Sequence, residues 1–175
     1  MDLKDFCELI KVEYCWFLYN YDDKNDATGN PRYLGFPFCC HLSANLISSY
    51  LSVHVDSSFR HYRFNASSFP HSWSSNKEEV IDFTVFQQKL TQDEKELFLN
   101  HKINDKNQFA QFINNYDCYY KKEDHIYDGF DNMFIEWHLY GVKYAENIKE
   151  DALTLESFMN YIKSAIREVN SNIFY

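Results

Sequence analysis

The segment FPFCCHLSANLISSYL, residues 36–51, constrains the fold more than any other part of this chain. Pro37 cannot continue a preceding helix and biases the residue before it toward an extended conformation. After two adjacent cysteines, apolar side chains recur at helical spacing: Leu42, Leu46, Ile47, Tyr50 and Leu51. The segment therefore predicts an extended entry, a sharp turn, and a helix that begins near Cys39 or Cys40 and runs to about Leu51.

Three other segments carry helix signals. Residues 3–19 place apolar side chains at helical spacing between charged ones, and residues 155–169 do the same. Thr91 and Glu94 have the spacing of a capping box, which predicts a helix to about Leu99. We expect amphipathic helices at both ends of the chain and a shorter one between them.

The strand signals lie between these helices. Residues 53–64 alternate β-branched and aromatic side chains, which is typical of a strand pair or an edge strand. Residues 68–73 and 78–86 predict two short strands around the polar turn SSNK. Residues 20–35 are polar and rich in turn formers, so we expect a loop there. The order of elements predicts an α+β domain.

Composition limits the classes of partner. Hydrophobic residues make up 45% and aromatic residues 19% of the 175 residues, enough for one packed domain. The 26 acidic residues outnumber the 17 basic ones and give a formal charge of −9, which argues against nucleic acid and anionic membranes as partners.

The opening MDLKDFCELI lacks the layout of a secretion signal, and no apolar run approaches the length of a membrane span. The five cysteines are odd in number and irregularly spaced, which does not suggest a disulfide framework. We expect a cytoplasmic protein; the oligomeric state stays open.

The predicted hairpin offers a histidine and a carboxylate. With the turn centred between Asn76 and Lys77, His71 lies opposite Asp82. Directly opposed residues have Cβ atoms about 5 Å apart, close enough for a carboxylate to hold an imidazole N–H. A slip of one residue would put the two side chains on opposite faces. The hairpin therefore predicts a His71–Asp82 couple that depends on the register.

Cys40 stands where a thiol becomes reactive. The start of a helix combines the positive end of its dipole with backbone N–H groups, and both stabilise a thiolate. A nearby imidazole would make the thiolate–imidazolium pair the resting state. In this hypothesis Cys40 is the nucleophile, His71 the proton carrier and Asp82 the residue that orients the imidazole. The Cys40 backbone N–H is placed to help bind an oxyanion.

The order of these residues resembles that of the papain-like and transglutaminase-like superfamily. At finer grain the chain resembles small bacterial proteins of the YunG-like family, whose cysteine segment is C-x-x-[TS]-A-x-L-x-x-x-Y-[LF]. Their downstream segment runs H-x-W, a short polar turn, IDLT and a glutamine. The residues that match are Cys40, Ser43, Ala44, Leu46, Tyr50, Leu51, His71, Trp73, Ile81, Asp82, Thr84, and Gln87 or Gln88.

The resemblance covers roughly residues 36–88 and implies a papain-like core, with the nucleophile helix packed on a small antiparallel sheet. On this basis residues 1–175 form a single domain. Residues 36–90 are its catalytic-type core, and residues 104–175 are a family-specific elaboration with extra C-terminal helices.

The resemblance also implies an amide hydrolase or acyltransferase of the peptidase, deamidase or transglutaminase type. The catalytic residues would be Cys40, His71 and Asp82, the substrate a protein or peptide, and no cofactor or metal would be needed. Trp73 and Thr84 become candidate substrate-binding residues, although Trp73 is most simply interpreted as a core residue of the sheet.

One departure from the family pattern supports a different hypothesis. Phe38 and Cys39 stand where a Gly-Gln pair commonly precedes the cysteine, so no glutamine that would help bind the oxyanion is identifiable. Both cysteines would then be small buried hydrophobes. The chain would be a catalytically inactive, acidic papain-like binding domain, or an immunity or anti-defence protein that masks a basic partner. Under either hypothesis Cys39 is structural.

Other groupings have weaker signals. Cys39, Cys40, His41 and His71 lack a second closely spaced ligand pair, so we do not expect zinc. His125 and His138 have no flanking ligand pattern and are interpreted as surface or core residues, with His138 held as a reserve for His71. Residues 104–148 have no clean period; the tyrosines between Tyr116 and Tyr144 suit the wall of a binding cleft.

Overall fold

The computed structural model describes residues 1–21, 35–64, 70–127 and 139–173 and has the α+β class that the sequence predicts. One antiparallel sheet has the strand order β1-β2-β3-β4, with β1 at Arg60–Phe64, β2 at His71–Ser75, β3 at Glu79–Ile81 and β4 at Tyr119–Lys121. The α-helices are α1 (Leu3–Asn20), α2 (Cys40–His54), α3 (Gln92–Leu99), α4 (Lys106–Ile113), α5 (Val142–Ala145) and α6 (Leu155–Asn172). Two 3₁₀ turns are η1 (Val85–Lys89) and η2 (Lys122–Asp124).

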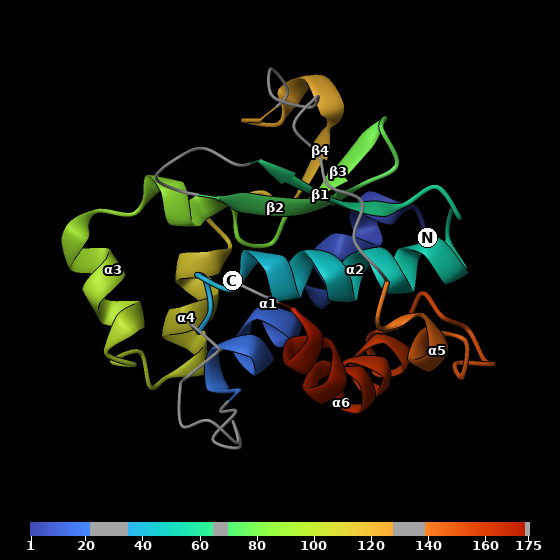
Figure 1. Ribbon diagram of the computed structural model, residues 1–175. Coiled ribbons are helices and arrows are strands. Elements are labelled where there is room, and N and C mark those ends of the chain that lie inside the picture. Colours follow the sequence, from blue (N-terminus) through green and yellow to red (C-terminus); the bar gives the residue numbers. More distant parts are fainter. Residues whose placement is uncertain (22–34, 65–69, 128–138, 174–175) are drawn as a thin grey trace.

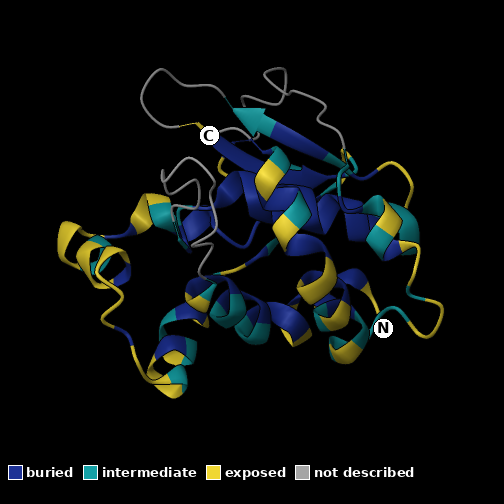
Figure 2. Cartoon of the chain, turned by 60° about the horizontal axis from the view of Figure 1, so that its bottom comes forward, coloured by how far each residue is buried: buried dark blue, intermediate teal, exposed yellow. Residues whose placement is uncertain are grey.

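Helix α2 is the middle layer of the molecule. It packs against β1 and β2 on one side and against α5 and α6 on another, as Figure 1 shows. Every residue from Cys40 to Leu51 is therefore buried, including the serines, and most of α2 is dark in Figure 2. A helix enclosed on both sides holds its first residues in a fixed position under the sheet.

An aromatic cluster fixes α2 against α1 and α6. The Phe158 ring lies 5.2 Å from that of Tyr14 and 5.1 Å from that of Tyr50, both edge to face. Each such pair contributes about 1 kcal/mol beyond its buried area. The Tyr14 hydroxyl also hydrogen-bonds Ser43 Oγ at 3.1 Å, which joins α1 to the first turn of α2.

The strand predictions need two corrections in extent. The strand expected over residues 53–64 begins only at Arg60, because α2 continues to His54. The strand expected over residues 78–86 ends at Ile81. It ends there because Asp82 Oδ1 accepts hydrogen bonds from the Thr84 N–H and hydroxyl, and this local turn replaces the strand ladder.

The hairpin register also differs from the predicted one. Ser74 pairs with Ile81, because the turn closes from Asn76 to Glu79 and is centred one residue later than expected. The pairing is therefore shifted by two residues, and His71 and Asp82 are not direct partners. An even shift keeps both side chains on the same face of the sheet.

The helix predictions at the two ends of the chain are confirmed by α1 and α6, and the Thr91–Glu94 capping box is present at the start of α3. Most of the loop expected over residues 20–35 lies outside the described residues.

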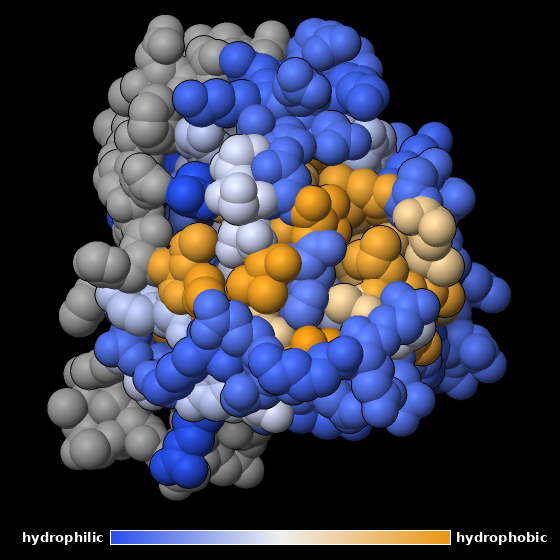
Figure 3. Space-filling view, turned by 90° about the vertical axis from the view of Figure 1, so that its right-hand side faces the viewer, coloured by the Kyte–Doolittle hydropathy of each residue, from blue (hydrophilic) through white to orange (hydrophobic). Residues whose placement is uncertain are grey.

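Hydrophobic side chains gather on the face that Figure 3 shows, which is the right-hand side of Figure 1. The N-terminus and the end of α2 lie on that side. Met1 and Val55 belong to these segments, and their exposed fractions are 69% and 40%.

Candidate active site

Cys40 is the first residue of α2, with Cys39 as the N-cap. Among the described residues, the Cys39 side chain makes no capping hydrogen bond to the helix start. Cys40 keeps 5% of its surface exposed, and its Sγ lies 3.9 Å from the Pro70 carbonyl oxygen at the entry to β2. The helix therefore presents the sulfur to the end of β2 at which His71 lies.

His71 and Asp82 form a buried pair. The His71 Nε2–H donates to Asp82 Oδ2 at 2.7 Å, and the exposed fractions of the two residues are 0% and 2%. The Asp82 N–H donates to the Cys118 carbonyl at 2.8 Å, which ties this residue to the segment before β4. Since Oδ1 is held by Thr84, the carboxylate is fixed from both sides, and it fixes the imidazole in turn.

The structure brings together the three residues that the sequence nominates. The His71 side chain lies close enough to the Cys40 sulfur to lower the pKa of its thiol, and it hydrogen-bonds Asp82. Because Nε2 faces the carboxylate, Nδ1 is the ring nitrogen left for the sulfur. The order is thus sulfur, imidazole, carboxylate.

His125 is a fourth member that the sequence interpretation missed. Its Nε2–H donates to the same Asp82 Oδ2 at 2.9 Å, and the residue is 4% exposed. It follows η2 and lies 43 positions from Asp82, in a region without periodicity. The available signal was indirect: a carboxylate between Ile81 and Phe83 needs several donors when it is buried.

A second imidazole lies beside the sulfur. His41 Nδ1 is 3.9 Å from Cys40 Sγ and 2.5 Å from Ser72 Oγ on β2. The sequence interpretation considered His41 only as a zinc ligand. The structure instead gives the Cys40 sulfur one imidazole from its own helix and one from the sheet.

Gln87, in η1, reaches the same histidine from a third direction. Its Nε2 lies 2.8 Å from His71 Nδ1. The family motif left Gln87 and Gln88 equivalent, and this contact distinguishes them: Gln87 is half-buried against the site, whereas Gln88 is exposed.

Electrostatics favour a charged pair. Burial alone would raise the pKa of Cys40, but hydrogen bonds to His41 and His71 outweigh it and lower that pKa to about 5. Burial alone would lower the pKa of His71, but Asp82 and then Cys40 outweigh it and raise that pKa to about 10. For Asp82, burial is likewise outweighed by His71 and His125, which hold its pKa well below the usual range. Near neutral pH these directions favour thiolate, imidazolium and carboxylate together.

The two candidate substrate-binding residues are both buried. Trp73 is 4% exposed and stacks on Tyr127 at a ring distance of 5.3 Å, so it packs in a small aromatic cluster on the sheet. Thr84 is 1% exposed and bonds Asp82. In this structure Thr84 holds the carboxylate, and neither residue offers an exposed surface.

The remaining candidates occupy other places. Cys39 is fully buried in the main core, as expected of a structural residue. His138, the reserve candidate, lies outside the described residues. In the part of the chain that the structure describes, no group of three His, Cys, Asp or Glu side chains is arranged to hold a metal ion.

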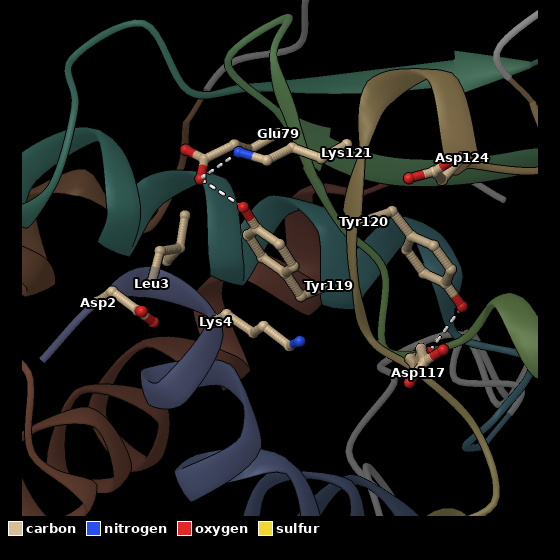
Figure 4. Close-up of a pocket in the computed structure, with 9 residues that line it drawn as sticks. All are labelled: Asp2, Leu3, Lys4, Glu79, Asp117, Tyr119, Tyr120, Lys121 and Asp124. Atoms are coloured by element: carbon tan, nitrogen blue, oxygen red, sulfur yellow. Dashed lines mark hydrogen bonds and ion pairs between the residues drawn. The ribbon is translucent and has the colours of Figure 1, made fainter.

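A cavity of about 810 Å³ lies at the start of α1, beside β3 and β4 (Figure 4). Its lining residues are Asp2, Leu3, Lys4, Glu79, Asp117, Tyr119, Tyr120, Lys121 and Asp124. Two of the tyrosines expected to line a cleft are here. The Tyr120 ring also lies 5.4 Å from that of His125, so this residue separates the cavity from the buried histidines.

No family description, curated protein or solved structure matches this chain. Within the described residues, none of the helices combines the length and the apolar character needed to cross a bilayer.

Proposed function

We propose that this protein is a cysteine-dependent hydrolase or acyltransferase that acts on an amide of a protein or peptide. The observation that carries the proposal is the buried His71–Asp82 pair beside the Cys40 thiol, whose sulfur lies at the start of a helix and 3.9 Å from the carbonyl oxygen of Pro70, the residue before His71. The arrangement also supports a papain-like or transglutaminase-like relationship, with α2 as the nucleophile helix and the four-stranded sheet carrying the base.

In the proposed reaction the Cys40 thiolate attacks the amide carbon. A C–S bond forms, and the carbonyl π pair moves to the oxygen. The intermediate collapses, the C–N bond breaks, and the Nδ1–H of His71 passes to the leaving nitrogen. Water or an amine then gives a proton to His71, attacks the thioester and releases the thiolate.

The arrangement of buried and exposed atoms supports this assignment of roles. Cys40 retains a small exposed fraction, while His71 and Asp82 are enclosed. Enclosure strengthens the attraction between imidazolium and carboxylate, because few water molecules screen it. A substrate therefore meets the sulfur first, while the imidazolium–carboxylate pair of His71 and Asp82 stays protected from solvent.

Alkylation with iodoacetamide near pH 6 tests the proposal without knowledge of the substrate. A thiol with a pKa of about 5 is mostly thiolate at pH 6, whereas an ordinary cysteine is less than about 1% thiolate. We expect Cys40 to react fast in the folded protein and His71→Ala to slow it by roughly tenfold or more.

Labelling of Cys40 only after denaturation would contradict the proposal. It would favour the second hypothesis, an inactive acidic domain that binds a basic partner. Retention of such a partner that vanishes in moderate salt would support that hypothesis, since the net charge of −9 is its basis.

A further inference from the structure

The side-chain amide of Gln87 lies at the one ring nitrogen that serves the sulfur. Asp82 occupies Nε2 of His71, so Nδ1 is the ring nitrogen left to exchange a proton with Cys40. Gln87 Nε2 lies 2.8 Å from that same Nδ1. Any group that exchanges a proton with Nδ1 must therefore lie beside the Gln87 amide.

A proton count shows what the amide does in each state. A neutral imidazole that donates from Nε2 has a lone pair on Nδ1, and this lone pair accepts the Gln87 N–H. In the thiolate–imidazolium pair that the site favours near neutral pH, Nδ1 carries a proton, so it is a donor and cannot accept. In that state the amide N–H has no acceptor on the ring.

In the proposed reaction two negatively charged acceptors arise on the side of His71 that exchanges the proton. They are the thiolate itself and, after attack, the oxygen of the carbonyl bonded to it. Gln87 is anchored close to the triad, because its backbone N–H donates to the Thr84 carbonyl at 3.1 Å and Thr84 bonds Asp82. It is also half-buried, so the amide borders solvent from which a substrate comes.

We propose that Gln87 is a catalytic residue that donates its side-chain N–H to the oxyanion of the tetrahedral intermediate on Cys40. This inference rests on the proposed function. It assigns the donor to a residue after the aspartate, whereas the position before the cysteine holds Phe38 and Cys39 and offers none. The backbone N–H groups at the start of α2 supply the complementary side of the oxyanion site.

Two small probes separate this role from a merely structural one. Iodoacetamide reacts by displacement of iodide and develops no oxyanion, whereas p-nitrophenyl acetate acylates the sulfur through one. We expect Gln87→Ala to lower the acylation rate of Cys40 about 100-fold, the effect typical of one lost oxyanion donor. The alkylation rate should change less than about threefold. Gln87→Met, which keeps the length of the side chain but has no N–H to donate, should show the same split.

Gln88→Ala is the matched control, because Gln88 is the next residue in the same turn and is exposed. It should leave both rates unchanged. Thermal unfolding of all variants checks that they fold alike.

Equal losses in both reactions would overturn the inference, because an amide that only holds the imidazole affects every reaction of the thiolate. No loss in either would overturn it too. Slow alkylation of the wild-type protein would overturn the proposed function and this inference together, so the two failures are distinguishable.

Discussion

The buried thiols of this protein occupy two contrasting regions. Cys7, Cys15 and Cys118 lie between α1 and the segment before β4, where burial raises the pKa of each thiol well above its usual value. Cys40 is almost as buried, yet its pKa is lowered. Burial is nearly the same in both regions, so it does not decide whether the pKa of the thiol is raised or lowered.

The charged side chains next to each sulfur decide the direction of the pKa shift. Cys118 Sγ lies 3.8 Å from Glu8 Oε1, and a nearby carboxylate adds to the cost of a thiolate. Cys40 has the imidazoles of His41 and His71, of which the second is held as a cation by Asp82. In one small fold, the pKa of a buried thiol is thus raised beside a carboxylate and lowered beside imidazoles.

The largest expected effect is the ratio between the alkylation rates of Cys40 and of the thiols in the other region. In a timed iodoacetamide pulse on the folded protein at pH 7, we expect Cys40 to react at least about 1000-fold faster than Cys118, because their thiolate fractions differ by more than that. Mass mapping of digested peptides measures all five cysteines in one sample. Comparable labelling of Cys118 would abolish the distinction between the two regions.

Asp82→Asn removes the charge on which the Cys40 region depends. Two buried imidazoles would lose their carboxylate, and we expect a loss of about 4 kcal/mol in the free energy of unfolding, measured by urea denaturation at pH 7. The pH midpoint of Cys40 alkylation should also move upward. Asp124→Asn is the control, since Asp124 is exposed, and it should change neither quantity. An unchanged midpoint in Asp82→Asn would show that Asp82 does not support the thiolate.

The sequence predicted the parts of this site that depend on local patterns. The start of α2 at Cys40 follows from Pro37 and the apolar stripe, which are encoded within sixteen residues. The prediction that His71 and Asp82 share a face was right although the predicted register was wrong. The register is shifted by two residues, and side chains in a strand alternate with period two. Local periodicity therefore placed Cys40 at the start of its helix and His71 on the face of the sheet that carries Asp82.

The site residues that the sequence did not identify are placed by contacts between segments distant in sequence. His125 reaches Asp82 only because β4 pairs with β3, and the three-residue strand β4 has no pattern that could be detected. Gln87 could not be distinguished from Gln88, because the end of β3 is set by side-chain bonds of Asp82 rather than by strand propensity. Both failures come from the hydrogen-bond needs of one buried carboxylate.

The pH dependence of stability tests the same charges. The pKa of His71 is raised to about 10, so its contribution is complete below about pH 6.5 and is lost as the pH rises toward 10. We expect the stability difference between wild type and His71→Gln to shrink by about 3 kcal/mol between pH 6 and pH 10, measured by urea denaturation. A difference that stayed constant over this range would mean that His71 is neutral in the folded protein. The pKa of Asp82 is lowered, so its own contribution is present above about pH 4 and is lost in acid.

The smallest effect should come from His125, which shares the carboxylate without touching the sulfur. Among the described residues four groups donate to Asp82, and His125→Ala removes one of them; we expect a loss of about 2 kcal/mol in the free energy of unfolding. Cys40 alkylation should slow less than in His71→Ala, because His71 keeps its own bond to Asp82. His54→Ala is the matched control: it removes an imidazole that bonds the Ala145 carbonyl at 2.8 Å, at the far end of α2. It should cost comparable stability and leave alkylation unchanged. If His125→Ala slowed alkylation as much as His71→Ala, the second imidazole on Asp82 would be part of the catalytic unit rather than its support.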